Sequence, residues 1–116
     1  MFRDERQRAQ AIAWLLPKQM RYMWNPIAGP TNVAWDLARN SSPLSGGEMV
    51  MLRVALDFWN MSGKALFADL FRLDDDNLRR VCGLAACSSS ADDADVDKWI
   101  HERMVIEDAM APTVGA

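Results

Sequence analysis

Apolar and polar positions recur with helical spacing along most of this chain. Breaks rich in proline, glycine, serine or asparagine separate the helical segments. The pattern predicts helices at about 4–16, 31–39, 46–61, 64–71, 75–86 and 93–107, with a further turn or two at 18–24. No segment of useful length alternates apolar and polar residues, so no strand is predicted. The expected fold class is all-α, a compact bundle of about five to six short helices.

The range 46–61 is predicted to be the central helix of this bundle. Its polar residues, Arg53, Asp57 and Asn60, form one narrow stripe, and almost every other position from 49 to 59 is apolar. A helix that is apolar on most of its circumference is buried on most of it. The other helices are therefore expected to pack around it, and Arg53 is expected to pair with Asp57 across one helical turn.

Residues 44–48, Leu-Ser-Gly-Gly-Glu, resemble the signature loop of ABC-type ATPases. That loop acts opposite a phosphate-binding loop of the G-x-x-x-x-G-K-[ST] type. The only Gly-Lys pair of this chain, Gly63-Lys64, has no glycine at the required distance before it. Ser45 and Glu48 instead match a capping box, which predicts a helix start rather than a nucleotide site.

Three predicted helices are expected to turn an apolar face inward, with Val33, Ala34, Leu37 and Ala38; Leu78, Val81, Cys82 and Ala85; and Val96, Trp99, Ile100 and Met104. Helix 4–16 has Ala9, Ile12, Ala13 and Leu16 on one face, and the short helix 64–71 has the apolar residues Leu66, Phe67, Leu70 and Phe71. The two cysteines, Cys82 and Cys87, are five residues apart on one predicted helix, which keeps them from pairing with each other. They are expected to be small buried thiols in a reducing compartment.

Length and composition are those of one ordinary globular domain. A chain of 116 residues, half of them apolar and a quarter charged, is expected to form a single helical domain over 1–116 with a frayed tail at about 109–116. No apolar run approaches the ~18 residues that cross a bilayer, and the first residues lack the apolar core of a signal peptide. A cytoplasmic location is therefore expected.

The net charge of −3 is unevenly distributed, because acidic residues gather in the C-terminal part of the chain. The two acidic groups are Asp74, Asp75 and Asp76, and Asp92, Asp93, Asp95 and Asp97. This distribution disfavours general nucleic-acid binding. Aspartates also gather at helix N-termini, where they complement the helix dipole. The two groups are therefore interpreted either as helix starts or as a binding surface.

No catalytic or metal-binding motif is complete in this sequence. The only histidine, His101, has no nucleophile motif to act with. The series Asp93, Asp95, Asp97 opens like a calcium loop, but Lys98 and Met104 stand where that loop needs glycine and glutamate. The spacing of the two cysteines is wide for structural zinc. The protein is therefore expected to be no enzyme and to carry no cofactor or metal.

Five tryptophans and eight methionines are more than a chain of this length usually contains. The segment Met20, Arg21, Tyr22, Met23 and Trp24 concentrates the residue types that are enriched at protein interfaces. Two interpretations remain open for this segment. Its side chains pack over one end of the central helix, or they form a patch that binds a partner.

The function predicted from these features is that of a small non-enzymatic protein that binds another protein. Residues 20–24 and the two acidic groups are the candidate partner-binding residues. By size and acidity alone, the chain resembles small inhibitors of phages and mobile elements, including anti-CRISPR proteins. The alternative is a helix-turn-helix DNA-binding regulator that uses residues 64–86, with Arg79 and Arg80 facing the DNA. A homodimer is the expected means of covering excess apolar surface on helix 46–61.

Overall fold

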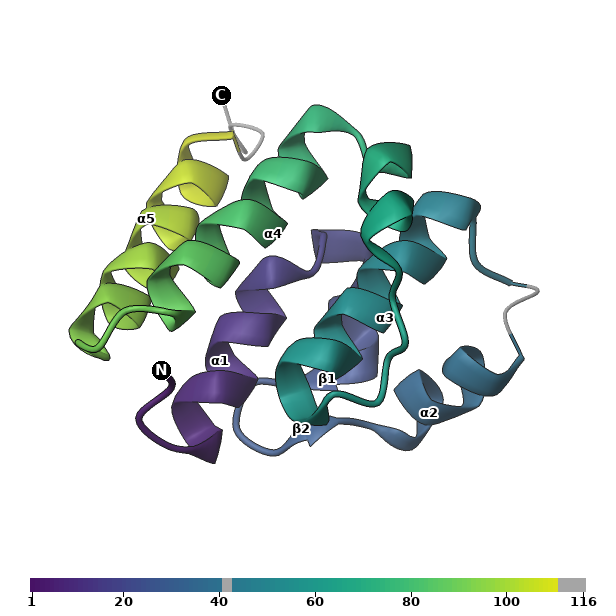
Figure 1. Ribbon diagram of the computed structural model, residues 1–116, viewed down its shortest axis with the longest axis horizontal. Helices are drawn as coiled ribbons and strands as arrows, with labels where there is room; N and C mark the ends of the chain where they lie inside the picture. The colour runs from purple at the N-terminus through teal and green to yellow at the C-terminus, as the bar shows by residue number, and fades with distance from the viewer. Residues whose placement is uncertain (41–42, 111–116) are drawn as a thin grey trace, which may run out of the picture.

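The computed structural model describes residues 1–40 and 43–110 (Figure 1). Its α-helices are α1 (Glu5–Leu15), α2 (Asn32–Arg39), α3 (Gly46–Asn60), α4 (Asp75–Ser88) and α5 (Ala94–Met110). Two 3-10 helices, η1 (Lys18–Met23) and η2 (Phe67–Arg72), and two short strands, β1 (Trp24–Asn25) and β2 (Gly29–Pro30), complete the described part. The predicted all-α class is confirmed. The predicted tail begins within α5, and its residues 111–116 lie outside the described ranges.

Helix α3 is buried, as its composition predicts. Its covered side chains are Met49, Val50, Met51, Leu52, Val54, Ala55 and Leu56. Helix α1 shares the central place, because it packs against α3, α4, α5 and both strands. The small buried residues Ala9, Ala11 and Ala13 allow neighbours to approach α1 closely. Since residues 49–56 are mostly covered by their own chain, this helix needs no second copy to bury it.

The helix starts follow the capping rules. The Ser45 hydroxyl accepts a hydrogen bond from the Glu48 N–H at 3.1 Å, and the Glu48 carboxylate accepts one from the Ser45 N–H at 3.0 Å. This reciprocal pair confirms the predicted capping box. Asp4 caps α1 and Asp74 caps α4, each accepting a hydrogen bond from the backbone three residues on. Local chemistry therefore sets where these helices begin.

The loop predicted for residues 25–30 contains a tight β-hairpin. Trp24 pairs with Pro30 and Asn25 with Gly29, in antiparallel register. The Asn25 side chain closes the turn by accepting hydrogen bonds from two backbone N–H groups inside it. Gly29 has a positive φ of 95° and lies against the Trp59 ring, where a Cβ atom would meet ring carbons at 2.7 Å. Glycine is required here by both conformation and space.

Helix α4 turns a different face to the core from the one predicted. Val81 and Leu84 are buried together with Arg80, whereas Cys82 and Ala85 are exposed. Arg80 can be buried because its guanidinium pairs with Asp76 at 3.0 Å while its alkyl stem packs inward. The prediction that Cys82 is a buried thiol is therefore wrong. Hydrophobic spacing alone did not identify a paired arginine as an inward residue.

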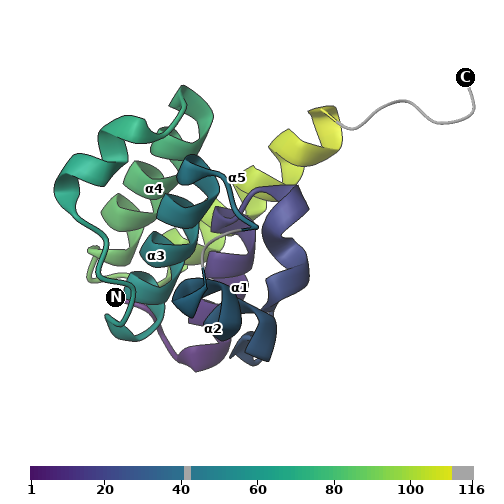
Figure 2. The same ribbon diagram turned by 90° about the vertical axis from the view of Figure 1, so that its right-hand side faces the viewer.

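Two further residues predicted to point inward are exposed. Val33 is 44% exposed on α2, which lies at the edge of the bundle, and Met104 is 39% exposed on α5. The second half of α5 projects beyond its neighbours (Figure 2). The apolar residues of its last turns therefore lie at the surface, because the neighbouring elements do not extend far enough to cover them.

Candidate protein-binding surface

The most exposed apolar segment of the described structure follows the end of α3. Leu66, Phe67 and Phe71 are 67%, 78% and 74% exposed. Phe67 and Phe71 meet edge to face, with ring centroids 5.5 Å apart. Isolated apolar residues at a surface are normal, but a cluster of large ones indicates a binding site. We call these three residues the η2 face.

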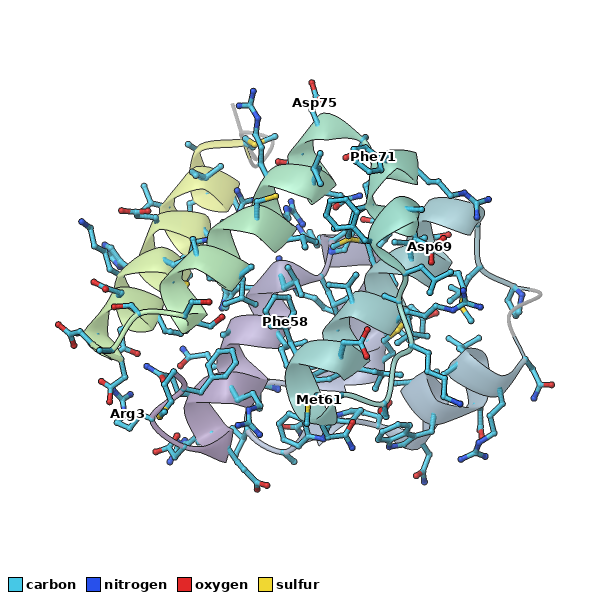
Figure 3. The ribbon with its side chains drawn as sticks, viewed as in Figure 1. Arg3, Phe58, Met61, Asp69, Phe71 and Asp75 are labelled. Atoms are coloured by element: carbon cyan, nitrogen blue, oxygen red, sulfur yellow. The ribbon has the colours of Figure 1, made fainter. Side chains whose placement is uncertain are left out.

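A groove runs beside the η2 face, where α3, η2 and α4 meet. Its volume is about 300 Å³, and it is lined by Val54, Asp57, Phe58, Ala65, Leu66, Phe67, Leu70 and Val81. Figure 3 shows Phe58 between the α3 and α4 ribbons, with Phe71 further up the same side of the molecule. All but one of the lining residues are apolar. The groove is therefore suited to apolar side chains of a partner.

The loop that presents the η2 face is tied down by Asp57. This residue, predicted to pair with Arg53, instead accepts hydrogen bonds from the backbone N–H groups of Gly63, Lys64 and Ala65, at 2.8, 3.0 and 2.9 Å. A carboxylate that accepts several backbone N–H groups makes strong, charge-assisted bonds. The surface presented by η2 is therefore held in place from α3.

Replacing Asp57 with alanine is expected to lower the free energy of unfolding by about 2–3 kcal/mol, because three backbone donors lose a charged acceptor. Urea denaturation measures this change. The exposed Asn60, on the same helix, is the control, and Asn60→Ala should change stability by no more than about 0.5 kcal/mol. Equal midpoints for the two variants would show that Asp57 does not anchor the loop.

The structure places the segment 20–24 mainly in the core. Met20 and Met23 are fully covered and Trp24 is 4% exposed. Trp24 meets Trp59 edge to face at the C-terminal end of α3, with ring centroids 5.9 Å apart. The interpretation of these three side chains as an exposed patch is wrong, and the packing interpretation is confirmed. Only Tyr22, at 63% exposure, is available to a partner in the way the sequence suggested.

Arg21 belongs to a charged cluster between η1 and α5. Its guanidinium lies over the Trp14 ring, 4.3 Å from the centroid, and makes paired hydrogen bonds to the Glu107 carboxylate. Arg80 and Arg103, both largely buried, lie close by and share Asp76. Hydrogen bonding from Arg21 holds the pKa of Glu107 below its ordinary value. Burial lowers the pKa of Arg80. The cluster joins α4, α5 and η1.

The lowered pKa of Glu107 predicts a stability that depends on pH. The ionised carboxylate stabilises the fold above its ordinary pKa, and this contribution is lost as the pH falls through the lowered value. Glu107→Gln should therefore cost about 2 kcal/mol at about pH 7 and clearly less at about pH 3. Denaturant unfolding at both pH values tests this. The exposed neighbour Asp108 serves as control, because Asp108→Asn should show little change at either pH.

Two residues of the first acidic group make contacts with their own chain. Asp74 accepts the capping hydrogen bond of α4 from the Asn77 N–H at 2.8 Å. Asp76 pairs with Arg80 and approaches Arg103 at 3.8 Å. Asp75 is exposed, and no hydrogen bond or ion pair of its side chain occurs within the described residues. It is the member of this group whose carboxylate is open to a partner.

The second acidic group is likewise engaged with its own chain. Asp92 and Asp95 accept hydrogen bonds at the turn into α5. Asp93 and Asp97 pair with Arg3, at 3.2 and 3.0 Å. The hydrogen bond from Arg3 is the main reason that the pKa of Asp97 lies below its ordinary value. These aspartates hold the N-terminal segment against α5.

The two acidic groups do not form one surface. The first group lies at the N-terminal end of α4, and the second lies beyond its C-terminal end, around the start of α5. Helix α4 has 14 residues, which is about 21 Å of helix. Figure 3 shows Asp75 at the top of the molecule and Arg3, which pairs with the second group, at the lower left. The two groups therefore do not come together as one acidic binding face.

The segment of the helix-turn-helix alternative has a different local structure from the one predicted. Helical structure begins at Phe67 rather than residue 64, and it is a 3-10 helix of 6 residues. Arg80, one of the two arginines assigned to the DNA, is buried against Asp76. Arg79 is exposed. The alternative stays a prediction, and a gel shift at low salt tests it.

Within the described residues, no group of three or more His, Cys, Asp or Glu side chains is arranged to hold a metal ion. No helix in the described ranges is both long enough and apolar enough to span a bilayer.

Sequence reasoning missed the η2 face, although it noted the apolar character of 66–71. Leu66, Phe67, Leu70 and Phe71 follow the spacing of an inward helical face. The signal in the sequence that could have revealed this exposure is the shortness of the segment, because a segment of six residues is too short to bury its own four large apolar side chains. Only the path of the loop after α3 shows which of them face outward.

The fold and this surface together define a small all-α bundle with an apolar groove open beside η2. No protein-family model matches the chain, and neither a curated protein nor a solved structure was found to be similar to it.

Proposed function

We propose that this protein acts by binding another protein through the η2 face and the groove beside it, without catalysing a reaction. The observation that carries the proposal is the exposure of Leu66, Phe67 and Phe71 beside an apolar groove that Leu66 and Phe67 help to line. Aromatic side chains dominate the energetics of protein interfaces, because each buries a large area at low entropic cost.

A protein partner fits this surface better than a small molecule does. A drug-sized ligand is usually enclosed by its pocket, whereas Phe67 and Phe71 stand largely in solvent around a groove of modest volume. A second surface must cover these rings to remove them from water. The inhibitor interpretation, drawn from size and acidity, is a narrower form of this proposal, in which the η2 face covers a site on the target.

Replacing the apolar side chain of Phe67 with a charged one tests the proposal. Tagged wild-type protein, Phe67→Asp and Val105→Asp are expressed in the cells that make the protein, and captured partners are identified and purified. Val105, 53% exposed on α5, is the matched control outside the groove. Titration calorimetry of the purified pair should show at least a tenfold loss of affinity for Phe67→Asp and little change for Val105→Asp.

Both variants should keep the wild-type circular dichroism spectrum, because both positions are exposed. Equal affinity of wild type and Phe67→Asp for every captured protein would overturn the proposal. So would the absence of any captured protein.

A further inference from the structure

The η2 face ends in negative charge. Phe71 is followed within five residues by Asp74, Asp75 and Asp76 at the start of α4. Figure 3 shows Phe71 and Asp75 near each other at the same end of the molecule. Of these aspartates, Asp75 is exposed and outside the internal ion pairs described above. A partner bound to the η2 face therefore meets, at one end of the contact, the Asp75 carboxylate, which forms no ion pair within the described residues.

The exposed area is small for a symmetric dimer. At the ~150–250 Å² of a whole aromatic side chain, the exposed parts of Phe67 and Phe71 amount to roughly 300 Å² between them. With Leu66 added, the three exposed side chains still present well under the ~800 Å² per partner of a standard interface. A second copy would also bring the same excess of acidic residues. Area and charge both favour a different, smaller contacting element.

The structure around the groove favours a helix as that element. The groove is walled by α3, η2 and α4, and the two strands lie elsewhere in the fold. An extended peptide would therefore find no strand edge here with which to pair its backbone. An amphipathic helix satisfies its own backbone hydrogen bonds and presents apolar side chains every three or four residues.

Building on the proposed function, we propose that the partner presents a basic amphipathic helix. Its apolar stripe occupies the groove and covers Phe67 and Phe71. Its lysine or arginine residues lie at the end nearest Asp75. Opposite charge at the edge of an apolar contact sets the orientation and the rate of association more than it adds affinity. The recognised chemistry is thus an apolar helical stripe with positive charge at one end.

Two designed helical peptides test this inference directly. Both are labelled 16-residue peptides with the same apolar stripe, and they differ only in three lysines or three glutamates at one end. Fluorescence anisotropy at low ionic strength should show about fivefold tighter binding of the lysine peptide, because Asp75 attracts its lysines and repels the glutamates of the other peptide. This preference should shrink as salt is added, because the contacts are screened. Phe67→Asp should abolish binding of both peptides.

A charge swap on the protein identifies the carboxylate. Asp75→Lys should reverse the preference, so that the glutamate peptide binds more tightly. The control is Glu102→Lys, an exposed glutamate on α5 outside the groove, which should leave the preference as it is in the wild type. The two variants have equal net charge, so the comparison separates a local contact from a general change in charge.

The results distinguish the two proposals. If neither peptide binds, or if both bind equally, the basic helix is wrong, while a captured partner that depends on Phe67 still supports protein binding. If peptide binding is the same for wild type and Phe67→Asp, the η2 face is not the site and both proposals fail. An unchanged preference in Asp75→Lys would remove the orienting role of that carboxylate and overturn the inference.

Discussion

Replacing Trp24 with alanine is expected to lower the free energy of unfolding by about 3–5 kcal/mol, a large share of the stability of a domain this size. The side chain is 4% exposed and packs edge to face against Trp59. Its indole N–H also donates a hydrogen bond to the buried Ala9 carbonyl at 3.1 Å. Truncation would leave a cavity between α1 and α3 and remove the hydrogen bond from the indole to the Ala9 carbonyl. Chemical denaturation followed by circular dichroism measures the loss.

Tyr22→Ala is the matched control, because Tyr22 lies two residues away and is 63% exposed. Its removal should change stability by no more than about 0.5 kcal/mol. A similar effect of both substitutions would contradict the assignment of Trp24 to the core.

Gly63→Ala is expected to destabilise the protein by about 3 kcal/mol or more, through a steric clash with the backbone. A Cβ atom at this position would lie 1.7 Å from the carbonyl oxygen of Arg53 and 3.0 Å from the backbone nitrogen of Asp57. The obstacle is main chain of α3, which has no rotamer through which to move away. The loop after α3 must therefore shift, and with it the hydrogen bond from the Gly63 N–H to Asp57.

Replacing Gly47 with alanine should have the opposite effect on the stability of the protein. Apart from its chain neighbours and the backbone of its own helix, no atom of the described residues lies within 4 Å of the Cβ position there, and Gly47 is in the first turn of α3. Alanine should stabilise the helix by about 0.5–1 kcal/mol, through the lower entropy of the unfolded chain. Thermal unfolding of both variants makes the comparison. If Gly63→Ala were as stable as wild type, the tight path of this loop over α3 would be wrong.

The loop at Gly63 also affects the proposed binding surface. It connects the end of α3 to Leu66 and Phe67, and Met61 and Lys64 adopt positive φ values of 63° and 56° along it. Such conformations are uncommon for residues other than glycine and are kept by the surrounding contacts. The three hydrogen bonds to Asp57 supply those contacts. Loss of the loop would therefore displace the η2 face.

Helix positions in this protein were largely predictable because their signals are local. The capping residues Ser45 and Asp74 and the helix-ending Pro17 act within one turn of their own position. The predicted start of α3 at Gly46 agrees with the structure for this reason. The apolar circumference of 46–61 likewise identified a buried helix before any partner element was known.

The candidate site was predictable only in part. The apolar residues at 66–71 were recognised, but as part of a helix beginning at residue 64 and without a prediction of which side they face. The three backbone donors that Asp57 engages lie six to eight residues ahead of it, so no helical or strand period marks this contact. An ion pair between Asp57 and Arg53 was predicted because residues four apart lie next to each other on a helix.

The sequence by itself determined the class of fold, the ends of its main helices and the identity of its most buried helix. The tertiary structure alone decided which apolar clusters lie inside. Trp24 is buried because Ala9 and Trp59, distant in sequence, form its surroundings, whereas Phe67 is exposed because none of the described elements covers it. Helical periodicity records which side chains share a face, but whether that face is covered depends on contacts between segments far apart in the chain.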